Sequence, residues 1–196
     1  LFNISIANKL TKGFIRNGHD VINFSYRDYR DKFMLKSNNA LNEKVLNITS
    51  NYRPDLILLG HNNILSQDII EKIKSQHKSK VALWYEDHLT KGGPNFSNNL
   101  NLIEKNKDLI DQYFLTIFPD LIKTSIPKKK MNFMPIPADK NIENLEIYNS
   151  NNRYKDLFFA LSHGVNYGKL KTRNIDERES FINDLINKNT KLTFNI

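Results

Sequence analysis

Two short apolar runs, each ending abruptly in polar and ionisable residues, dominate the pattern of this chain. They are PDLILLGHNN at Pro54–Asn63 and KVALWYEDHL at Lys80–Leu89. Between them, Ile69, Ile70 and Ile73 recur at the spacing of one helix face. Parallel strands that are buried on both faces have continuous hydrophobic sequences, so this stretch predicts a strand–helix–strand βαβ unit. The carboxyl ends of such strands border the ligand crevice of open α/β sheets, and we expect a site there.

The same alternation of helices and strands extends in both directions along the chain. Apolar residues between Ile6 and Ile15 lie on one predicted helix face, Val21–Phe24 is a predicted strand, and a second helix ends before Pro54. Beyond the βαβ unit the sequence predicts a helix at Leu100–Leu109, a strand at Gln112–Phe118, a short helix at Asp120–Ser125 and a strand at Met131–Pro137. This order is typical of an α/β protein with a Rossmann-like, doubly wound parallel sheet.

A stretch without periodicity then interrupts the pattern. Pro135–Arg153 contains two prolines and many Asn and Ser residues, which is typical of a linker. We therefore expect a Rossmann-like N-terminal domain at 1–137, a linker at 138–153 and the truncated beginning of a second Rossmann-like domain at 154–196. In that last part the sequence predicts a strand at Lys155–Gly164, a helix at Asp176–Lys188 and a strand at Leu192–Ile196.

The composition of the chain excludes several classes of protein. Hydrophobic residues make up 39% of the chain, enough for a core, and no apolar run approaches the ~18 residues of a membrane span. The absence of cysteine excludes disulfides and thiolate metal sites and is compatible with a reducing cytoplasm. We find no secretory signal, and Leu1 is not an initiator methionine, so we expect a cytoplasmic protein and a fragment of a longer chain.

The chain is basic, with 29 Lys and Arg against 21 Asp and Glu and a net charge of +8. These cations are mostly scattered, and only Lys128–Lys130 and Lys169–Arg173 form clusters. Because no strip of aromatic residues alternates with basic ones, nucleic acid is not the expected partner, and steep salt dependence of binding would be needed to favour it. Lys128–Lys130 is interpreted as a solvated turn, with peripheral contact to the inner face of a membrane as the alternative.

The richest group of ionisable residues is Glu86-Asp87-His88, directly after the second apolar run. A carboxylate beside a histidine at a strand end can be tuned for general acid–base work or for stabilising a positive transition state, so we assign these three as catalytic candidates. His61 and Asn62 follow Gly60 at the neighbouring strand end and are candidates for binding the substrate. The alternatives are that Asp87 caps the next segment and that the histidines are merely solvated.

Other chemistry is less well supported at these strand ends. No H-E-x-x-H or comparable spacing is present, so we expect no metal. Trp84 and Tyr85 lie within a predicted strand and are assigned to the core.

The other candidate is the loop SHGVNYGKLKTR at Ser162–Arg173. Its glycines free the backbone, and its cations suit an anion at the start of a helix, which together favour a diphosphate. It matches neither G-x-G-x-x-G nor a Walker A sequence. The phosphate-binding candidates are Ser162, His163, Gly164, Asn166, Lys169 and Arg173.

Several of these segments together resemble a known family. They are the Gly18-His19-Asp20-Val21 corner, the WYEDH strand end, the YFLTIFPD strand, the PIPADK segment and the restart at DLFFALSHG. In this layout the chain resembles GT-B glycosyltransferases, within the glycosyltransferase group 1 proteins and their spore-maturation-like, surface-polysaccharide branch. The resemblance spans nearly the whole chain as a layout, although none of its motifs is diagnostic by itself.

The resemblance implies two Rossmann-like domains facing each other, with the acceptor on the N-terminal one and the nucleotide-sugar on the C-terminal one. The Ser162–Arg173 loop would then border the donor diphosphate, whereas the donor-binding glutamates of the family would lie beyond Ile196. The expected function is transfer of a sugar from a nucleotide-sugar to a polysaccharide, lipid or protein acceptor, without a cofactor. The alternative is a non-catalytic, two-lobed protein that binds a small ligand.

Overall fold

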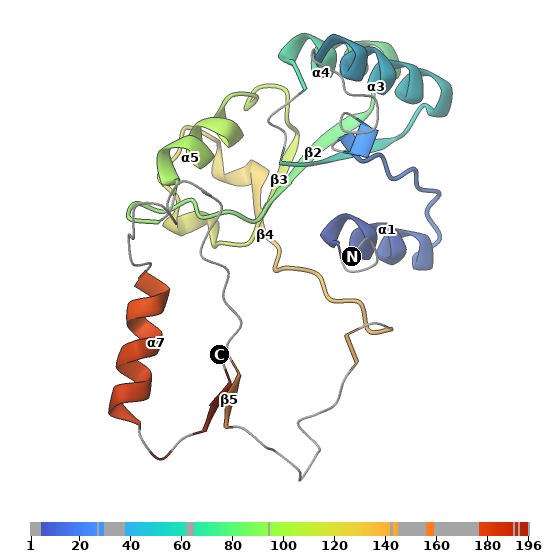
Figure 1. Ribbon diagram of the computed structural model, residues 1–196. Coiled ribbons are helices and arrows are strands. Elements are labelled where there is room, and N and C mark those ends of the chain that lie inside the picture. Colours follow the sequence, from blue (N-terminus) through green and yellow to red (C-terminus); the bar gives the residue numbers. More distant parts are fainter. Residues whose placement is uncertain are drawn as a thin grey trace. The chain divides into compact units, whose positions relative to one another are not determined.

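The computed structural model describes most of the chain and divides it into two compact units. The described residues are 5–26, 28–29, 38–61, 65–93, 95–141, 143–144, 156–158, 177–189, 191 and 193–195. The first unit is Leu1–Glu143 and the second is Asn144–Ile196 (Figure 1). Each unit is described here by itself.

A four-stranded parallel sheet forms the centre of the first unit. Its strands lie in the order β1-β2-β3-β4, which is also their order along the chain. They are β1 (Leu56–Gly60), β2 (Lys80–Tyr85), β3 (Gln112–Leu115) and β4 (Met131–Phe133). All three pairings are parallel, so the carboxyl ends of the four strands lie along one edge of the sheet. The α/β class and the parallel sheet predicted from the sequence are confirmed.

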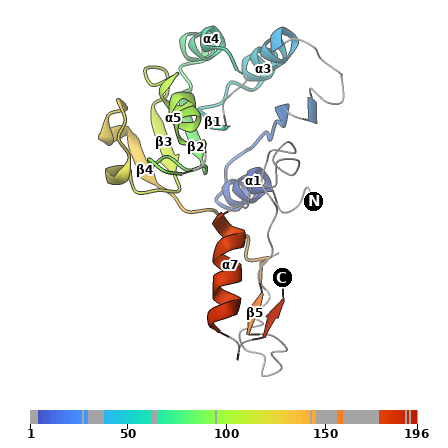
Figure 2. The same ribbon diagram turned by 60° about the vertical axis from the view of Figure 1, so that its left-hand side comes forward.

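One face of the sheet carries the main hydrophobic core. Helix α4 (Gln67–His77) connects β1 to β2, and helix α5 (Phe96–Glu104) connects β2 to β3. Right-handed crossovers that advance in one direction place their helices on the same face. The core accordingly joins Ile70 of α4 and Ile103 of α5 to alternate strand residues, among them Leu83 and Tyr113. The sheet, α4 and α5 can be followed in both views (Figures 1 and 2).

The described residues of the first unit also include the helices α1 and α3 and two short 3-10 turns. Helix α1 covers Ile6–Arg16 and helix α3 covers Asn38–Tyr52, and α3 lies beside α4 in both views (Figures 1 and 2). The 3-10 turns are η2 (Pro119–Leu121) and η3 (Lys128–Lys130). The short helix expected at Asp120–Ser125 is therefore only a single turn. The βαβ unit expected at Pro54–Leu89 is present.

The strand expected at Val21–Phe24 is wrong. These residues have no regular secondary structure, and the Ile22 side chain is 51% exposed. Among the described strands β1 pairs only with β2, so Val21–Phe24 does not pair with the other edge of β1. Local preference for extended structure alone therefore does not establish a strand.

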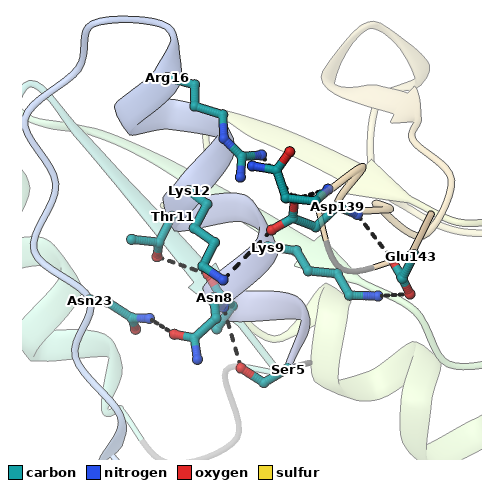
Figure 3. Close-up of polar contacts among 11 residues, drawn as sticks. Ser5, Asn8, Lys9, Thr11, Lys12, Arg16, Asn23, Asp139 and Glu143 are labelled. Carbon is teal, nitrogen blue, oxygen red and sulfur yellow. Dashed lines mark hydrogen bonds and ion pairs between the residues drawn. The ribbon is translucent and has the colours of Figure 1, made fainter. Parts of the chain in front are cut away.

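Ion pairs attach α1 to a segment far along the chain (Figure 3). Arg16 Nη1 lies 3.0 Å and Lys12 Nζ 3.7 Å from the carboxylate of Asp139, and Lys9 pairs with Glu143. These three cations are spaced three and four residues apart, which places them on one face of the helix. Asp139 and Glu143, which the sequence assigned to the linker, thus contact the first helix.

Asp139 is held by backbone groups as well. Its carboxylate accepts a hydrogen bond of 3.0 Å from the amide of Asn141, and its own amide donates to the carboxylate of Glu143 at 2.8 Å. The amide hydrogen bond and the Arg16 guanidinium hold the pKa of Asp139 below its usual range. Lys9 and the Asp139 amide do the same for the pKa of Glu143. Both carboxylates are therefore ionised near neutral pH.

The second unit contains a short parallel pair and one helix within its described residues. Strands β5 (Leu157–Phe158) and β6 (Phe194–Asn195) pair in parallel, and α7 covers Glu177–Lys188. The Asp156 carboxylate accepts a hydrogen bond of 2.8 Å from the backbone amide of Thr193, beside this pair. None of the helices in the described ranges of either unit has the length and apolar character that a membrane crossing requires.

Candidate functional site

The polar residues after β1 and β2 come together at the carboxyl edge of the sheet. Gly60, the last residue of β1, pairs with Trp84 near the end of β2, so the residues that follow the two strands are neighbours. His61 has a φ of 46°, a left-handed conformation that is uncommon for residues other than glycine. His61 Nε2 lies 2.9 Å from Glu86 Oε1, a hydrogen-bonding distance.

The second ring nitrogen of His61 faces another carboxylate. Nδ1 of His61 lies 3.6 Å from Oδ2 of Asp87, which is longer than a hydrogen bond. The side chain of Asp87 is 51% exposed, whereas that of His61 is 24% exposed. The tight contact of His61 is therefore with Glu86, and the looser one opens towards solvent.

Tyr85 adds a buried hydroxyl to this group. Its ring centre lies 4.9 Å from that of His61, and the residue is 1% exposed. Burial, with further contributions from the negative charges of Asp87 and Glu86, raises the pKa of Tyr85 well above its ordinary value. The hydroxyl thus keeps its proton and can donate a hydrogen bond at any physiological pH.

Two buried polar atoms at this place have no hydrogen-bond partner of good geometry in the described structure. They are the hydroxyl oxygen of Tyr85 and Oε2 of Glu86. Asp87 is close to the Tyr85 hydroxyl and contributes, after burial, to its raised pKa. Both unsatisfied atoms are buried, so the side chain of this group that solvent reaches most is Asp87.

The arrangement supports proton transfer by His61. When Nε2 carries the proton and donates it to Glu86, Nδ1 is left as an acceptor. A histidine oriented by a carboxylate in this way is a competent general base for a hydroxyl group. The half-exposed Asp87 lies 3.6 Å from Nδ1 and could hold the same hydroxyl.

His88, expected to be catalytic, turns to the loop that follows β2. Its Nδ1 accepts a hydrogen bond of 3.3 Å from the amide of Thr90 and lies 3.1 Å from the Thr90 hydroxyl. A Cβ atom on Gly93 would lie only 2.0 Å from the same nitrogen, so the ring occupies the space that Gly93 leaves. Asn99 also donates to the backbone carbonyl of His88 at 3.0 Å. These contacts give His88 a part in shaping the loop.

Of the other residues singled out in the sequence, the structure describes some and not others. Trp84 and Tyr85 are buried, as expected for core positions, but no pattern in the sequence indicated that the Tyr85 ring would contact His61. A Cβ atom on Gly60 would meet nothing within 4 Å, so the space beside it is open. Asn62 and the whole Ser162–Arg173 loop lie outside the described residues.

Within the part of the chain that is described, no three His, Asp or Glu side chains are grouped so as to hold a metal ion. Comparisons of the chain with protein-family models, with curated proteins and with solved structures found no match. The argument for a function therefore depends on the geometry at the carboxyl edge of the sheet.

Proposed function

We propose that this chain is part of a glycosyltransferase of the GT-B type and that its first unit binds the acceptor. In this proposal the hydroxyl of a glycan or lipid acceptor lies at His61, Glu86 and Asp87. The nucleotide-sugar diphosphate would be bound by the Ser162–Arg173 loop, in the second Rossmann-like domain that begins there. The parallel sheet supports the proposal in a general way, since ligands of such sheets bind at the carboxyl ends of the strands.

The single observation that carries the proposal is the hydrogen bond of 2.9 Å between His61 and Glu86. It fixes the imidazole and leaves Nδ1 facing the more exposed Asp87. The Asp87 carboxylate is half exposed beside it and accepts hydrogen bonds of the kind that the hydroxyl groups of a sugar donate.

The chemistry in this proposal is proton removal during group transfer. His61 Nδ1 takes the proton of the acceptor hydroxyl while its oxygen forms a bond to the anomeric carbon of the donor sugar. The bond from that carbon to the nucleoside diphosphate breaks, and the leaving group carries away the electron pair. Glu86 stabilises the resulting imidazolium, and Asp87 positions the hydroxyl. A general base of this kind contributes about 10²–10⁴-fold to the rate.

The experiment is release of UDP or GDP from a panel of nucleotide-sugars by the full-length protein, with and without glycan acceptors. We expect one donor to be consumed faster with acceptor. The variant His61→Asn should slow this by about 100-fold or more, because asparagine tolerates the left-handed backbone while lacking a base. His77→Asn is the matched control, since His77 lies at the end of α4 and contacts Ser50.

Three outcomes decide the matter. Turnover that depends on His61 and Glu86 but not on His77 supports the proposal. Binding of a saccharide without turnover of any donor favours the non-catalytic ligand-binding protein instead. If the protein neither binds a saccharide nor turns over any donor in the panel, the glycosyltransferase proposal is wrong.

A further inference from the structure

Four exposed apolar side chains belong to the segment 118–136, which contains the η2 turn and β4. Phe118, Leu121, Phe133 and Ile136 are 57%, 61%, 43% and 59% exposed. The rings of Phe118 and Phe133 stack with centres 4.3 Å apart and planes at 19°. Large apolar side chains gathered in one place on a surface mark an interaction site more often than scattered ones do. We call these four residues the apolar patch.

Lys128 places a cation beside the apolar patch. It donates to the backbone carbonyl of Pro119 and, at 3.1 Å, to that of Ile122, so its ammonium lies on the η2 turn that carries Leu121. Lys123 follows the same turn directly in the chain, and Lys123, Lys128 and Lys129 are all exposed. The exposed apolar side chains and these lysines therefore belong to one short stretch of the chain, 118–136.

We propose that the apolar patch and its lysines dock the first unit on an anionic lipid surface. Apolar side chains that enter the boundary between headgroups and acyl chains gain from burial, and neighbouring lysines gain from anionic headgroups. Each feature is weak by itself, but together they match both layers of such a surface. A protein partner would need a complementary face of its own, whereas a bilayer presents negative charge and an apolar interior everywhere. This inference concerns residues other than those of the proposed acceptor site and does not depend on it.

The lysines contribute unequally to structure. Lys130 donates to the carbonyls of Lys107 and Ile110 at 2.9 and 2.8 Å, and Lys128 holds η2, so both support the local fold. Lys123 and Lys129 are exposed, and no structural hydrogen bond is recorded for either ammonium within the described contacts. The latter two are therefore the positions at which charge can be removed with the least effect on folding.

The test is co-sedimentation of the full chain with lipid vesicles. Vesicles of phosphatidylcholine alone are compared with vesicles that contain about a third phosphatidylglycerol. We expect binding to the anionic vesicles and little to the neutral ones. The variant Lys123→Gln with Lys129→Gln should weaken binding on the order of twentyfold. Phe118→Ser with Phe133→Ser should weaken it about tenfold or more.

Matched controls separate this surface from the general basicity of the chain. Lys44→Gln with Lys72→Gln removes the same charge from exposed positions on α3 and α4, and Phe181→Ser removes a phenylalanine that is 61% exposed on α7. Both controls should bind as the unchanged chain does. Circular dichroism of every variant establishes that the fold is kept.

Each remaining outcome contradicts the inference. Equal loss in the lysine variant and its control would mean that net charge alone attracts the chain. Full binding by the phenylalanine variant would mean that the apolar patch does not enter the lipid. A dimer in solution that the phenylalanine variant dissociates would assign the patch to self-association, and absence of binding to either vesicle would exclude the lipid surface.

Discussion

Arg16 Nη1 donates a hydrogen bond of 3.0 Å to Oδ1 of Asp139, and the Asp139 side chain is only 1% exposed. The variant Asp139→Asn keeps the shape of this side chain but removes its charge, so Arg16 and Lys12 lose their shared counter-ion. We expect α1 to open more often, because the ion pairs that attach it to Asp139 are lost. Hydrogen exchange should therefore become faster in α1 and stay unchanged in β2 and β3. Asp108→Asn, at an exposed position, is the control.

The same attachment predicts a response to acid. The pKa values of Asp139 and Glu143 are both lowered in the folded protein, chiefly by the Asn141 amide and by Lys9 respectively. A lowered folded pKa means that the stabilisation is complete above the ordinary value of about 4 and is lost as the pH falls below it. We expect the amide signals of α1 in an NMR titration to change below about pH 4. Signals that hold steady far below this range would show that the ion pairs do not attach α1.

A side chain at position 93 would clash with the ring of His88. A Cβ atom there would lie 2.0 Å from His88 Nδ1, so Gly93→Ala should push the ring away and cost about 1–3 kcal/mol of stability. Gly13→Ala is the control, because Gly13 lies within α1 and a Cβ atom there meets nothing within 4 Å. That change should stabilise the chain by about 0.5–1 kcal/mol. Urea unfolding measures both, and similar values for the two variants would contradict the packing of His88 on Gly93.

The Tyr113 hydroxyl makes one buried hydrogen bond, and its contribution to the free energy of unfolding can be measured. Its hydroxyl donates to the carbonyl of Ile103 at 3.1 Å, and both residues are 0% exposed. Ile103 lies in the last turn of α5, where backbone carbonyls have no partner within the helix. Tyr113→Phe should therefore lower the free energy of unfolding by about 1–2 kcal/mol, measured in urea. An unchanged midpoint would mean that another donor replaces the hydroxyl.

The sheet could be predicted from the sequence because its signals are local. The runs at Pro54–Asn63 and Lys80–Leu89 each have the length and hydrophobicity of a buried parallel strand, and the isoleucines between them have the spacing of one helix face. Since carboxyl ends of adjacent parallel strands share an edge, the closeness of His61 and Glu86 followed from the same pattern. The sequence therefore indicated that the two residues lie near each other, but not which side chains pair.

What could not be predicted depends on contacts between distant residues or on single torsion angles. The left-handed backbone of His61 decides which carboxylate its Nε2 meets, and no pattern of hydrophobicity encodes it. Asp139 lies in a stretch without periodicity, and its importance comes from α1, 123 positions away in the chain. In the sequence His88 was as good a site candidate as Glu86 and Asp87. In the structure its ring occupies the space that Gly93 leaves.

The unbroken order β1-β2-β3-β4 has a consequence for how this protein can evolve. Each connection that leaves the carboxyl edge borders only the connections of the adjacent strands. An insertion after β4 would therefore remodel the apolar patch without disturbing the His61–Glu86 pair, and a change after β1 would do the reverse. Selection can act on the two surfaces separately. We therefore expect relatives that keep one surface and differ in the other.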